Sequence, residues 1–486
     1  MVKTKEFTLI DLEDIKLFIN GEWVTAESNS FFSLKNPSTG EIVTEIPRGG
    51  RKEARNAIEA ASTAFPKWAA LTAYERADYL LKLKDLMLDN EAELASIMSI
   101  EMGKAYSEAR GEVKYAASFL TWYAEEGRRI YGETIPASVS NKRLFVVKQP
   151  VGVIAAITPW NFPLAMMTRK LGPALAAGCT GVVKPASQSP LSAFAFAKLV
   201  ELAGIPNGVV NIVAGATGEI SDEIFENPEV KKISFTGSTE VGKKLVEKSA
   251  PQLKKLALEL GGHAPFIVFE DADLEKAAEG ALASKFRNAG QTCVCANRIY
   301  VHEKVKDDFA KILVEKVKQL KIGNSLDETV QIGPLVNEQG VQKVEEHVLD
   351  ALAKGAVVLQ GGKRYGEKGC FYEPTVLGNV TKDMKIMKEE TFGPVAPITT
   401  FKDDQEVIRE ANDTIYGLAA YLYTSDISRA VKVSEALNFG VIGLNDGVPG
   451  TAQAPFGGMN QSGYGREGGH QGIKDYLEEK YISLSL

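Results

Sequence analysis

The chain has 486 residues, which is too long for a single hydrophobic core, so we expect two domains or more. Its composition of 44% hydrophobic and 24% charged residues is ordinary for a globular protein and excludes a mainly disordered chain. The net charge of −7, with no block of basic residues, argues against nucleic acid as a partner.

The lack of a targeting signal and the small number of cysteines both favour a cytoplasmic protein. The first 16 residues, MVKTKEFTLIDLEDIK, lack the apolar core of a signal peptide and the acid-poor composition of a transit peptide. No apolar run reaches the ~18 residues that a membrane span requires, so no membrane association is expected. The four cysteines are too few for a disulfide framework in so long a chain: Cys179, Cys293, Cys295 and Cys370.

The first 150 residues predict strands, then helices, then a polar hairpin. Residues 18–24 and 36–43 read as strands, the second with a turn inside it, and residues 51–130 have the three- and four-residue apolar spacing of helices. Residues 128–149 are strand-like and polar. Such a hairpin either leaves the body to contact another subunit or lies on the surface as an ordinary hairpin.

From residue 151 onward, strands and helices alternate. The strands are apolar throughout, which predicts a parallel sheet covered on both faces and, in doubly wound order, a nucleotide-binding domain. A second α/β block covers about 260–450, and the C-terminal tail reads as a strand. The expected strands are 151–158, 180–185, 209–215, 231–237 and 356–362, and the expected helices are about 165–177, 190–203, 217–226, 238–249, 274–286 and 304–320.

Two reactive side chains stand at the ends of predicted elements. Glu259 closes an apolar run just before Gly261 and Gly262, and Cys293 lies in the loop sequence NAGQTCVC. A carboxylate and a thiol beside glycines are a candidate base and nucleophile, which only the fold can bring together. Taken singly, the thiol would be a small buried hydrophobe and the carboxylate a surface residue.

A candidate phosphate-binding turn occupies residues 237–242, GSTEVG, after a predicted strand, although G-x-G-x-x-G is absent. Gly237 permits the turn, and the free N–H groups of a helix start suit a pyrophosphate. Ser238 and Thr239 can serve as helix cap or as phosphate ligand, and the residues alone leave both readings open. Lys184 ends an apolar strand at the edge where α/β sheets bind ligands, or it is simply a solvated lysine.

Seven short motifs in order resemble the aldehyde dehydrogenase superfamily over nearly the whole chain. Residues 286–298, FRNAGQTCVCANR, are most similar to succinate-semialdehyde dehydrogenases. The motifs are PWNFP (159–163), KPAS (184–187), FTGSTEVG (235–242), LELGG (258–262), GQTC (290–293), EETFGP (389–394) and PFGG (455–458).

The resemblance implies an α/β fold of three parts and a homo-oligomer, either a dimer or a tetramer. Residues 1–127 and 149–259 would form a Rossmann-type cofactor domain, and residues 260–460 an α/β catalytic domain. Residues 128–148 and 461–486 would form a small β oligomerisation element.

The resemblance also implies a mechanism. Cys293 would attack the aldehyde carbon, and the Asn161 side-chain amide and the Cys293 backbone N–H would hold the oxyanion. After hydride transfer, Glu259 would activate the water that hydrolyses the thioester. The carboxylate at 259 favours hydrolysis over transfer to coenzyme A. The alternative of a non-catalytic structural relative, or of an esterase, is disfavoured because all three residues and the cofactor positions are retained.

NADP or NAD is the implied cofactor, and no metal is implied. Lys184 would bind the adenine-side ribose, Glu390 the nicotinamide ribose, and Phe392 would pack near the nicotinamide ring. Many NAD-preferring relatives carry Glu at position 187, so the neutral Ser187 predicts that NADP is accepted or preferred. The expected cofactor residues are Thr158, Pro159, Trp160, Lys184, Ser187, Gly237, Ser238, Gly242, Leu260, Glu390 and Phe392.

The implied substrate is succinate semialdehyde, whose distal carboxylate Arg169 and Arg287 would hold. As isolated residues, both arginines would more often form structural ion pairs. Gly450 stands where many of these enzymes have a serine, and Thr451 is a possible substitute. The alternatives are therefore α-ketoglutarate semialdehyde, or a broader range of aldehydes.

Cys295 follows Cys293 by two positions, and some succinate-semialdehyde dehydrogenases pair these cysteines in a reversible disulfide. A bond between such close cysteines is strained and labile, which would make it a redox switch. The alternative is an unpaired thiol beside the site.

Overall fold

The computed structural model describes residues 7–486 and confirms the α/β fold, with two large sheets, a three-stranded sheet and a two-stranded sheet in that part of the chain. Four short strands open the chain, and four helices follow them. The elements are β1 (Leu17–Ile19), β2 (Glu22–Val24), β3 (Phe31–Lys35), β4 (Ile42–Pro47), α1 (Arg51–Ala69), α2 (Ala73–Asp89), α3 (Glu91–Met102) and α4 (Tyr106–Gly127).

Local sequence explains where these helices begin and end. Thr72 and Glu75 form a capping box at the start of α2, each side chain bonding the other's backbone N–H. Helix α3 ends at Gly103, whose φ of 83° is left-handed and therefore suits glycine. The sharp stop at Gly103 leaves Lys104 in the short connection to α4.

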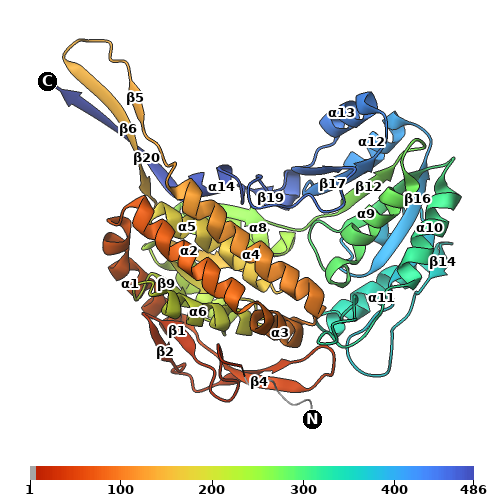
Figure 1. Ribbon diagram of the computed structural model, residues 1–486, viewed down its shortest axis with the longest axis horizontal. Coiled ribbons are helices and arrows are strands. Elements are labelled where there is room, and N and C mark those ends of the chain that lie inside the picture. The colour runs from red at the N-terminus through yellow and green to blue at the C-terminus, as the bar shows by residue number, and fades with distance from the viewer. Residues whose placement is uncertain (1–6) are drawn as a thin grey trace.

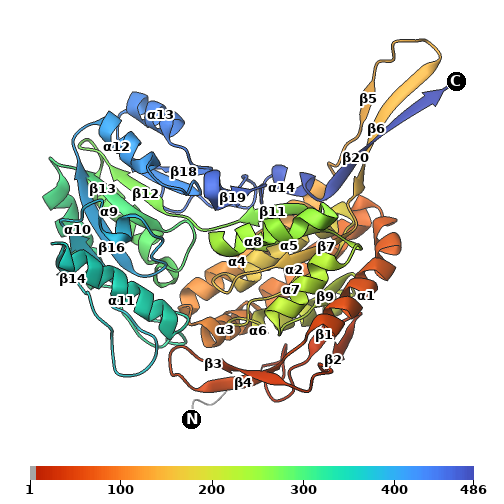
Figure 2. The same cartoon turned by 180° about the vertical axis from the view of Figure 1, so that it is seen from behind.

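The eight-stranded sheet has the order β19-β11-β10-β7-β8-β9-β1-β2, and its five central strands are parallel. Helices α5 and α6 cover one face beneath an outer layer of α2, α3 and α4 (Figure 1), and α7 and α8 cover the other (Figure 2). The bounds are β7 (Val153–Ile157), α5 (Pro163–Ala177), β8 (Thr180–Lys184), α6 (Leu191–Ala203), β9 (Val210–Ile212), α7 (Thr217–Glu226), β10 (Val230–Thr236), α8 (Thr239–Ser249), η1 (Ala250–Gln252) and β11 (Lys255–Glu259).

This sheet is doubly wound, because the chain runs outward from β7 in one direction and then returns to build β10 on its other side. The strand order therefore reverses between β7 and β10. Ligands of open α/β sheets bind at the carboxyl ends of the strands beside such a reversal.

The seven-stranded sheet has the order β14-β15-β16-β13-β12-β17-β18 and is parallel except for β14. Its elements are β12 (Ala264–Val268), α9 (Leu274–Phe286), η2 (Arg287–Gly290), β13 (Ala296–His302), α10 (Lys306–Lys318), α11 (Glu338–Ala353), β14 (Val357–Gln360), β15 (Thr375–Gly378), η3 (Lys385–Met387), β16 (Val395–Phe401), α12 (Asp404–Asn412), β17 (Ala419–Tyr423), α13 (Ile427–Ala436) and β18 (Val441–Leu444).

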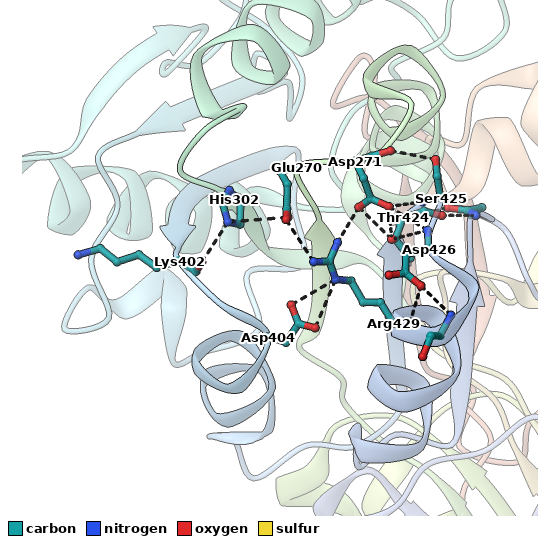
Figure 3. Close-up of polar contacts among 11 residues, drawn as sticks. Glu270, Asp271, His302, Lys402, Asp404, Thr424, Ser425, Asp426 and Arg429 are labelled. Atoms are coloured by element: carbon teal, nitrogen blue, oxygen red, sulfur yellow. Dashed lines mark hydrogen bonds and ion pairs between the residues drawn. The ribbon is translucent and has the colours of Figure 1, made fainter.

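A polar network joins the carboxyl ends of β16, β13, β12 and β17 (Figure 3). Arg429, on α13, contacts Asp271 at 2.8 Å, Glu270 at 3.2 Å and Asp404 at 3.2 Å, and His302 lies 3.8 Å from Glu270. The Asp271 carboxylate also accepts hydrogen bonds from the segment after β17, which comprises Thr424, Ser425 and Asp426.

The predicted hairpin and C-terminal strand pair with each other and project from the body as a three-stranded sheet (Figures 1 and 2). Most of their residues are exposed or half-buried, as the polar sequence requires. The remaining bounds are β5 (Glu133–Ile135), β6 (Lys142–Pro150), η4 (Asn460–Ser462), β19 (Gly463–Tyr464), α14 (Gln471–Lys474) and β20 (Leu477–Ser485).

The buried apolar side chains form two clusters. One comes mainly from residues 9–260 with a few from 452–477, and the other from residues 264–439. The domain boundaries and the cytoplasmic location remain predictions. Among residues 7–486, no helix is both long and apolar enough to cross a membrane.

Candidate active site

The candidate site lies where the carboxyl edge of the eight-stranded sheet meets the amino ends of strands in the seven-stranded sheet. Glu259 is the last residue of β11, and Cys293 comes shortly before β13. The loop to Cys293 turns sharply, because Asn288 and Ala289 have left-handed φ angles of 52° and 53°. At Gly290, a Cβ atom would lie only 2.1 Å from the Gly393 carbonyl oxygen, so the close approach of the two chains requires glycine.

Cys293 lines two cavities, which meet at its side chain. The arginine cavity, of about 350 Å³, contains Arg169 and Arg287 in its wall. The sheet-edge cavity, of about 400 Å³, lies at the carboxyl edge of the eight-stranded sheet and includes Gly237 and Ser238. Cys293 therefore lies where the two cavities adjoin, together with Phe162 and Met166, which line both.

The two predicted arginines differ in their partners. Arg169 is buried, its Nε lies 2.9 Å from Glu467, and its guanidinium lies 4.1 Å from the centre of the Phe456 ring. Arg287 stacks less closely on Phe162, at 5.4 Å, and makes no ion pair within the described part of the chain. Arg169 therefore makes an ion pair and also lines the arginine cavity, while Arg287 lines it with no ion pair in the described residues.

Gly450 lies in the wall of the arginine cavity, whereas its neighbour Thr451 does not line it. The Thr451 hydroxyl instead bonds the side chain of Gln453. A Cβ atom on Gly450 would meet only the Tyr115 hydroxyl, at 3.5 Å. A Cβ atom would therefore fit at position 450 in ordinary contact with Tyr115, and its absence leaves the cavity wall without a side chain at this point.

Asn161 lies in the turn after β7 and lines the sheet-edge cavity together with Cys293. Its side-chain amide donates to the Gln291 carbonyl oxygen at 3.0 Å. Its own carbonyl oxygen accepts from Lys104 Nζ at 2.7 Å and from the Asn288 amide at 3.1 Å. Contacts from two segments, the loop of residues 288–291 and the connection that carries Lys104, therefore fix the position of Asn161.

Glu259 is buried and lines neither cavity, but its charge acts on Cys293. Burial, and then the nearby Glu467 carboxylate, raise the pKa of Glu259 well above its usual range. Burial likewise raises the pKa of the Cys293 thiol to about 12. In the residues that the structure describes, Glu259 Oε2 has no hydrogen-bond partner, which leaves it free to accept a proton.

Seven of the predicted cofactor residues line the sheet-edge cavity. Trp160 and Phe392 pack edge to face with ring centres 5.5 Å apart, and Ser238 caps α8 by accepting from Val241 N. Glu390 accepts from Gly262 N at 3.1 Å, and burial raises the pKa of its carboxyl to about 7. The seven are Pro159, Trp160, Gly237, Ser238, Leu260, Glu390 and Phe392.

The other four predicted cofactor residues flank this cavity without lining it. Thr158 and Lys184 lie side by side at the ends of β7 and β8, joined by a bond from Thr158 N to Lys184 O. Burial lowers the pKa of the Lys184 amine to about 8. Gly242, on α8, packs so closely on Leu260 that a Cβ atom would lie 2.6 Å away, and Ser187 is half-buried after β8.

Sequence reasoning missed several residues of both cavities. In the arginine cavity, Lys104, Glu108 and Glu112 recur every fourth residue, a charged helical face whose spacing could have been noticed. No comparable pattern marks the others. These include Tyr115, Phe162, Tyr421 and Phe456 in the arginine cavity, and Gln188, Gln291, Asn337, Lys343 and Thr391 in the sheet-edge cavity.

Cys293 and Cys295 are both free thiols in the structure. Cys295 is fully buried and lines neither cavity, and its sulfur contacts the Lys285 carbonyl oxygen at 3.4 Å. The redox switch remains a prediction. Across residues 7–486, no group of three or more His, Cys, Asp or Glu side chains is arranged to hold a metal ion.

Comparison with known proteins agrees with this architecture, and the chain belongs to the aldehyde dehydrogenase family, whose model matches residues 23–482. It is 55% identical over 480 residues to the NADP(+) succinate-semialdehyde dehydrogenase of Escherichia coli (strain K12), covering 98% of this chain and 100% of the relative. It is 54% identical over 482 residues to the glutarate-semialdehyde dehydrogenase of Pseudomonas putida, with coverages of 98% and 100%. A crystal structure of succinate-semialdehyde dehydrogenase from Burkholderia pseudomallei superposes with a TM-score of 0.96, at 53% identity and 98% coverage of each chain.

Proposed function

We propose that this enzyme oxidises succinate semialdehyde to succinate, with NADP or NAD as hydride acceptor. The observation that carries the proposal is the Arg287 guanidinium, which makes no ion pair in residues 7–486 and lines the same cavity as the Cys293 thiol. An arginine fork binds a carboxylate through two parallel hydrogen bonds. The relatives named above act on four- and five-carbon semialdehydes, which supports an acid-bearing substrate.

The sheet-edge cavity fits a nicotinamide dinucleotide. Gly237 and Ser238 place the N-terminus of α8 at its wall, where backbone N–H groups favour a pyrophosphate. Lys184 is a buried amine without an ion pair in the described residues, which suits ribose hydroxyls. A Cβ atom on Gly261 would lie 3.0 Å from Glu390 Oε2, so glycine keeps this carboxylate accessible. When bound, the nicotinamide ring supplies the acceptor for the hydride.

In the proposed first step, Cys293 attacks the aldehyde carbon and gives a thiohemiacetal. The Asn161 amide and the Cys293 backbone N–H then stabilise the oxyanion, since both belong to turns that the surrounding contacts hold in place. Because the pKa of the buried thiol is raised to about 12, a positive charge in the adjoining cavity is needed to favour the thiolate.

The thiohemiacetal becomes a thioester when its carbon gives up a hydride to the acceptor and its oxygen keeps no proton. In the proposed second step, Glu259 then removes a proton from water, which hydrolyses the thioester on Cys293 and frees the acid and the thiol. Its raised pKa makes the carboxylate a stronger base than an exposed glutamate would be. Its partner-free Oε2 can accept the proton. This carboxylate favours release of a free acid over transfer to coenzyme A.

A longer acid is the second candidate substrate. Gly450 adds no side chain to the wall of the arginine cavity, which leaves more room there than the serine of many relatives would. This favours an additional methylene or carbonyl group in the substrate, as in glutarate or α-ketoglutarate semialdehyde. The relative from P. putida supports this candidate.

Initial rates test the proposal directly. Succinate, glutarate and α-ketoglutarate semialdehydes and the neutral butyraldehyde would each be assayed with NAD and with NADP. We expect Arg287→Ala to raise KM about tenfold or more for the acids, since it removes a charge-assisted pair, and to leave KM for butyraldehyde nearly unchanged. If Arg287→Ala raised KM equally for the acid and neutral aldehydes, Arg287 would not bind the substrate carboxylate. If no aldehyde reduced either cofactor, the protein would be a non-catalytic relative.

We also propose that the sheet of β5, β6 and β20 joins copies of the chain into a dimer or tetramer. Its exposed strands and its projection from the body support this role. Light scattering on a variant with Pro at Tyr481, in the exposed part of β20, would detect a smaller assembly if the proposal holds.

A further inference from the structure

Lys104 and Glu112 form a buried ion pair directly behind the turn that carries Asn161. Both side chains are 1% exposed, and Lys104 Nζ donates to the Glu112 carboxylate. The same Nζ donates to the Asn161 carbonyl oxygen at 2.7 Å and lies 3.8 Å from the centre of the Phe162 ring. The lysine therefore contacts two consecutive residues of the turn.

The second oxygen of Glu112 holds the other end of the same turn. Glu112 Oε1 accepts from Leu164 N at 3.0 Å and from Ala165 N at 3.2 Å, which are first-turn amides of α5. These N–H groups have no acceptor within their helix, and the side chain of Phe162, at the N-cap position, cannot accept a hydrogen bond from them. Glu112 thus caps α5 from a neighbouring helix, while its partner Lys104 holds the residue before the cap.

A second buried carboxylate shows that such capping does not require a lysine. Glu101 accepts from Leu191 N at 2.7 Å and from Ser192 N at 3.1 Å, and so caps α6 in the same way. It makes no ion pair within residues 7–486. Burial raises the pKa of its carboxyl to about 8, so it caps the helix partly in its neutral form. The additional contact that distinguishes the Glu112 site is the one from Lys104 to Asn161.

A buried ion pair is a weak source of stability, because desolvation of the two charges offsets their attraction. We therefore expect this ion pair to matter for the placement of Asn161 more than for the stability of the fold. Asn161 must present its amide to an oxyanion in a defined place, and displacement by about 1 Å can reduce a rate by about 100-fold.

We propose that Lys104 and Glu112 are positioning residues, which fix the Asn161 turn so that its amide meets the developing oxyanion. The inference rests on the proposed function, in which Asn161 stabilises that oxyanion. Both residues act through Asn161 and through the start of α5, and neither needs to touch the aldehyde.

A competing role exists because Lys104 also reaches the wall of the arginine cavity, where it could bind the substrate carboxylate itself. The two roles differ for a neutral aldehyde. A positioning residue affects the first turnover of butyraldehyde and of succinate semialdehyde alike, whereas a carboxylate ligand affects KM for the acid alone.

The experiment compares Glu112→Gln, Lys104→Met, and the double variant Lys104→Met/Glu112→Gln, which removes both charges of the pair together. The readout is the stopped-flow rate of cofactor reduction in the first turnover at saturating concentrations. We expect the double variant to slow this step about 10- to 100-fold with either aldehyde, with KM for the acid changed far less. Glu101→Gln is the matched control: it should lower the melting temperature but change the first-turnover rate less than about twofold.

Combination with Asn161→Ala separates positioning from general support of the fold. If Lys104 and Glu112 act through Asn161, the double variant has no further effect on the first turnover once Asn161 is alanine. The inference would be overturned if the rate losses of Asn161→Ala and of the double variant multiplied when combined, or if the double variant slowed the acid substrate alone. Either result would leave the proposed function standing. If Asn161→Ala alone reacts at the wild-type rate, the oxyanion step of the proposed function fails and the inference fails with it.

Discussion

The two parallel sheets of this enzyme differ at their carboxyl edges, where open α/β sheets usually bind ligands. At the eight-stranded sheet this edge borders a cavity of about 400 Å³ that includes Gly237, Ser238 and Cys293. At the seven-stranded sheet the corresponding edge is filled by the network of Arg429 with Glu270, Asp271 and Asp404 (Figure 3). The same kind of edge therefore borders a cavity in one half of the molecule and carries a network of charged side chains in the other.

The difference lies in the residues that follow each strand. After β10 come Gly237 and Ser238, which are small and leave the backbone N–H groups of α8 accessible. After β12 come Glu270 and Asp271, which α13 neutralises with Arg429. Strand order alone therefore does not make a ligand site, because side chains can occupy the same crevice.

The largest effect is expected at the open edge, from Glu259→Gln at the end of β11. Loss of the proposed general base should lower the steady-state rate about 10²- to 10⁴-fold while the first turnover of cofactor reduction persists. We expect stopped-flow measurements to show a burst of cofactor reduction followed by almost no further turnover. Mass spectrometry should then detect the acyl-enzyme. Loss of the burst as well would show that Glu259 acts before thioester formation.

At the closed edge, Arg429→Met should affect stability rather than catalysis. It leaves three carboxylates without their shared cation, and because these groups are partly exposed we expect a loss of about 2 kcal/mol in the free energy of unfolding. Urea denaturation measures this loss, and Arg429→Lys should give an intermediate value. A changed KM for either substrate in the folded variant would mean that the closed edge communicates with the active site.

A smaller effect is expected from Ser187→Glu, which places a charge at the open edge after β8. The new carboxylate should repel a 2′-phosphate and shift the ratio of kcat/KM values towards NAD about tenfold, or about 1.4 kcal/mol. Ser187→Gln has the same length without the charge and should shift the ratio much less. A similar shift in both variants would point to side-chain size instead of charge.

The smallest effect concerns the pH dependence of cofactor binding. Burial raises the pKa of Glu390 to about 7, so its carboxyl is largely protonated at pH 6 and becomes ionised above 7. Because the ionised form accepts hydrogen bonds from ribose more strongly, the dissociation constant of the cofactor should fall a few-fold, roughly, from pH 6 to 7.5. Fluorescence titration tests this, and Glu390→Gln should flatten the profile. The range stops at pH 7.5 because the Lys184 amine, whose pKa burial lowers to about 8, is half deprotonated at pH 8.

Much of the fold follows from the sequence because its signals are local. The apolar strands and the helices between them appear within a few residues of their predicted places, as β10 does over Val230–Thr236. The hairpin and the tail were each predicted as strands, but their pairing as β6 with β20 joins residues far apart in the chain. The motifs likewise indicated that Cys293 and Asn161 should meet, and the structure places them in the wall of one cavity.

What the sequence did not reveal depends on contacts between distant segments. Nothing near Arg169 in the chain indicates that Glu467 neutralises one side of its guanidinium, and this leaves Arg287 as the freer cation. Lys104 reads as a helix-flanking charge until the fold buries it against Asn161. The sequence shows that position 450 has no side chain, but its place beside Tyr115 in the wall of the arginine cavity required the structure.

The place of Cys293 in the wall between two cavities has a consequence for inhibition. If the two cavities bind as proposed, a compound that fills the arginine cavity competes with the aldehyde and leaves the sheet-edge cavity free, and a nucleotide analogue does the converse. Inhibitors of the two kinds can therefore occupy one enzyme molecule together. Linking them across the sulfur atom would give a single bivalent ligand whose second half binds at high effective concentration.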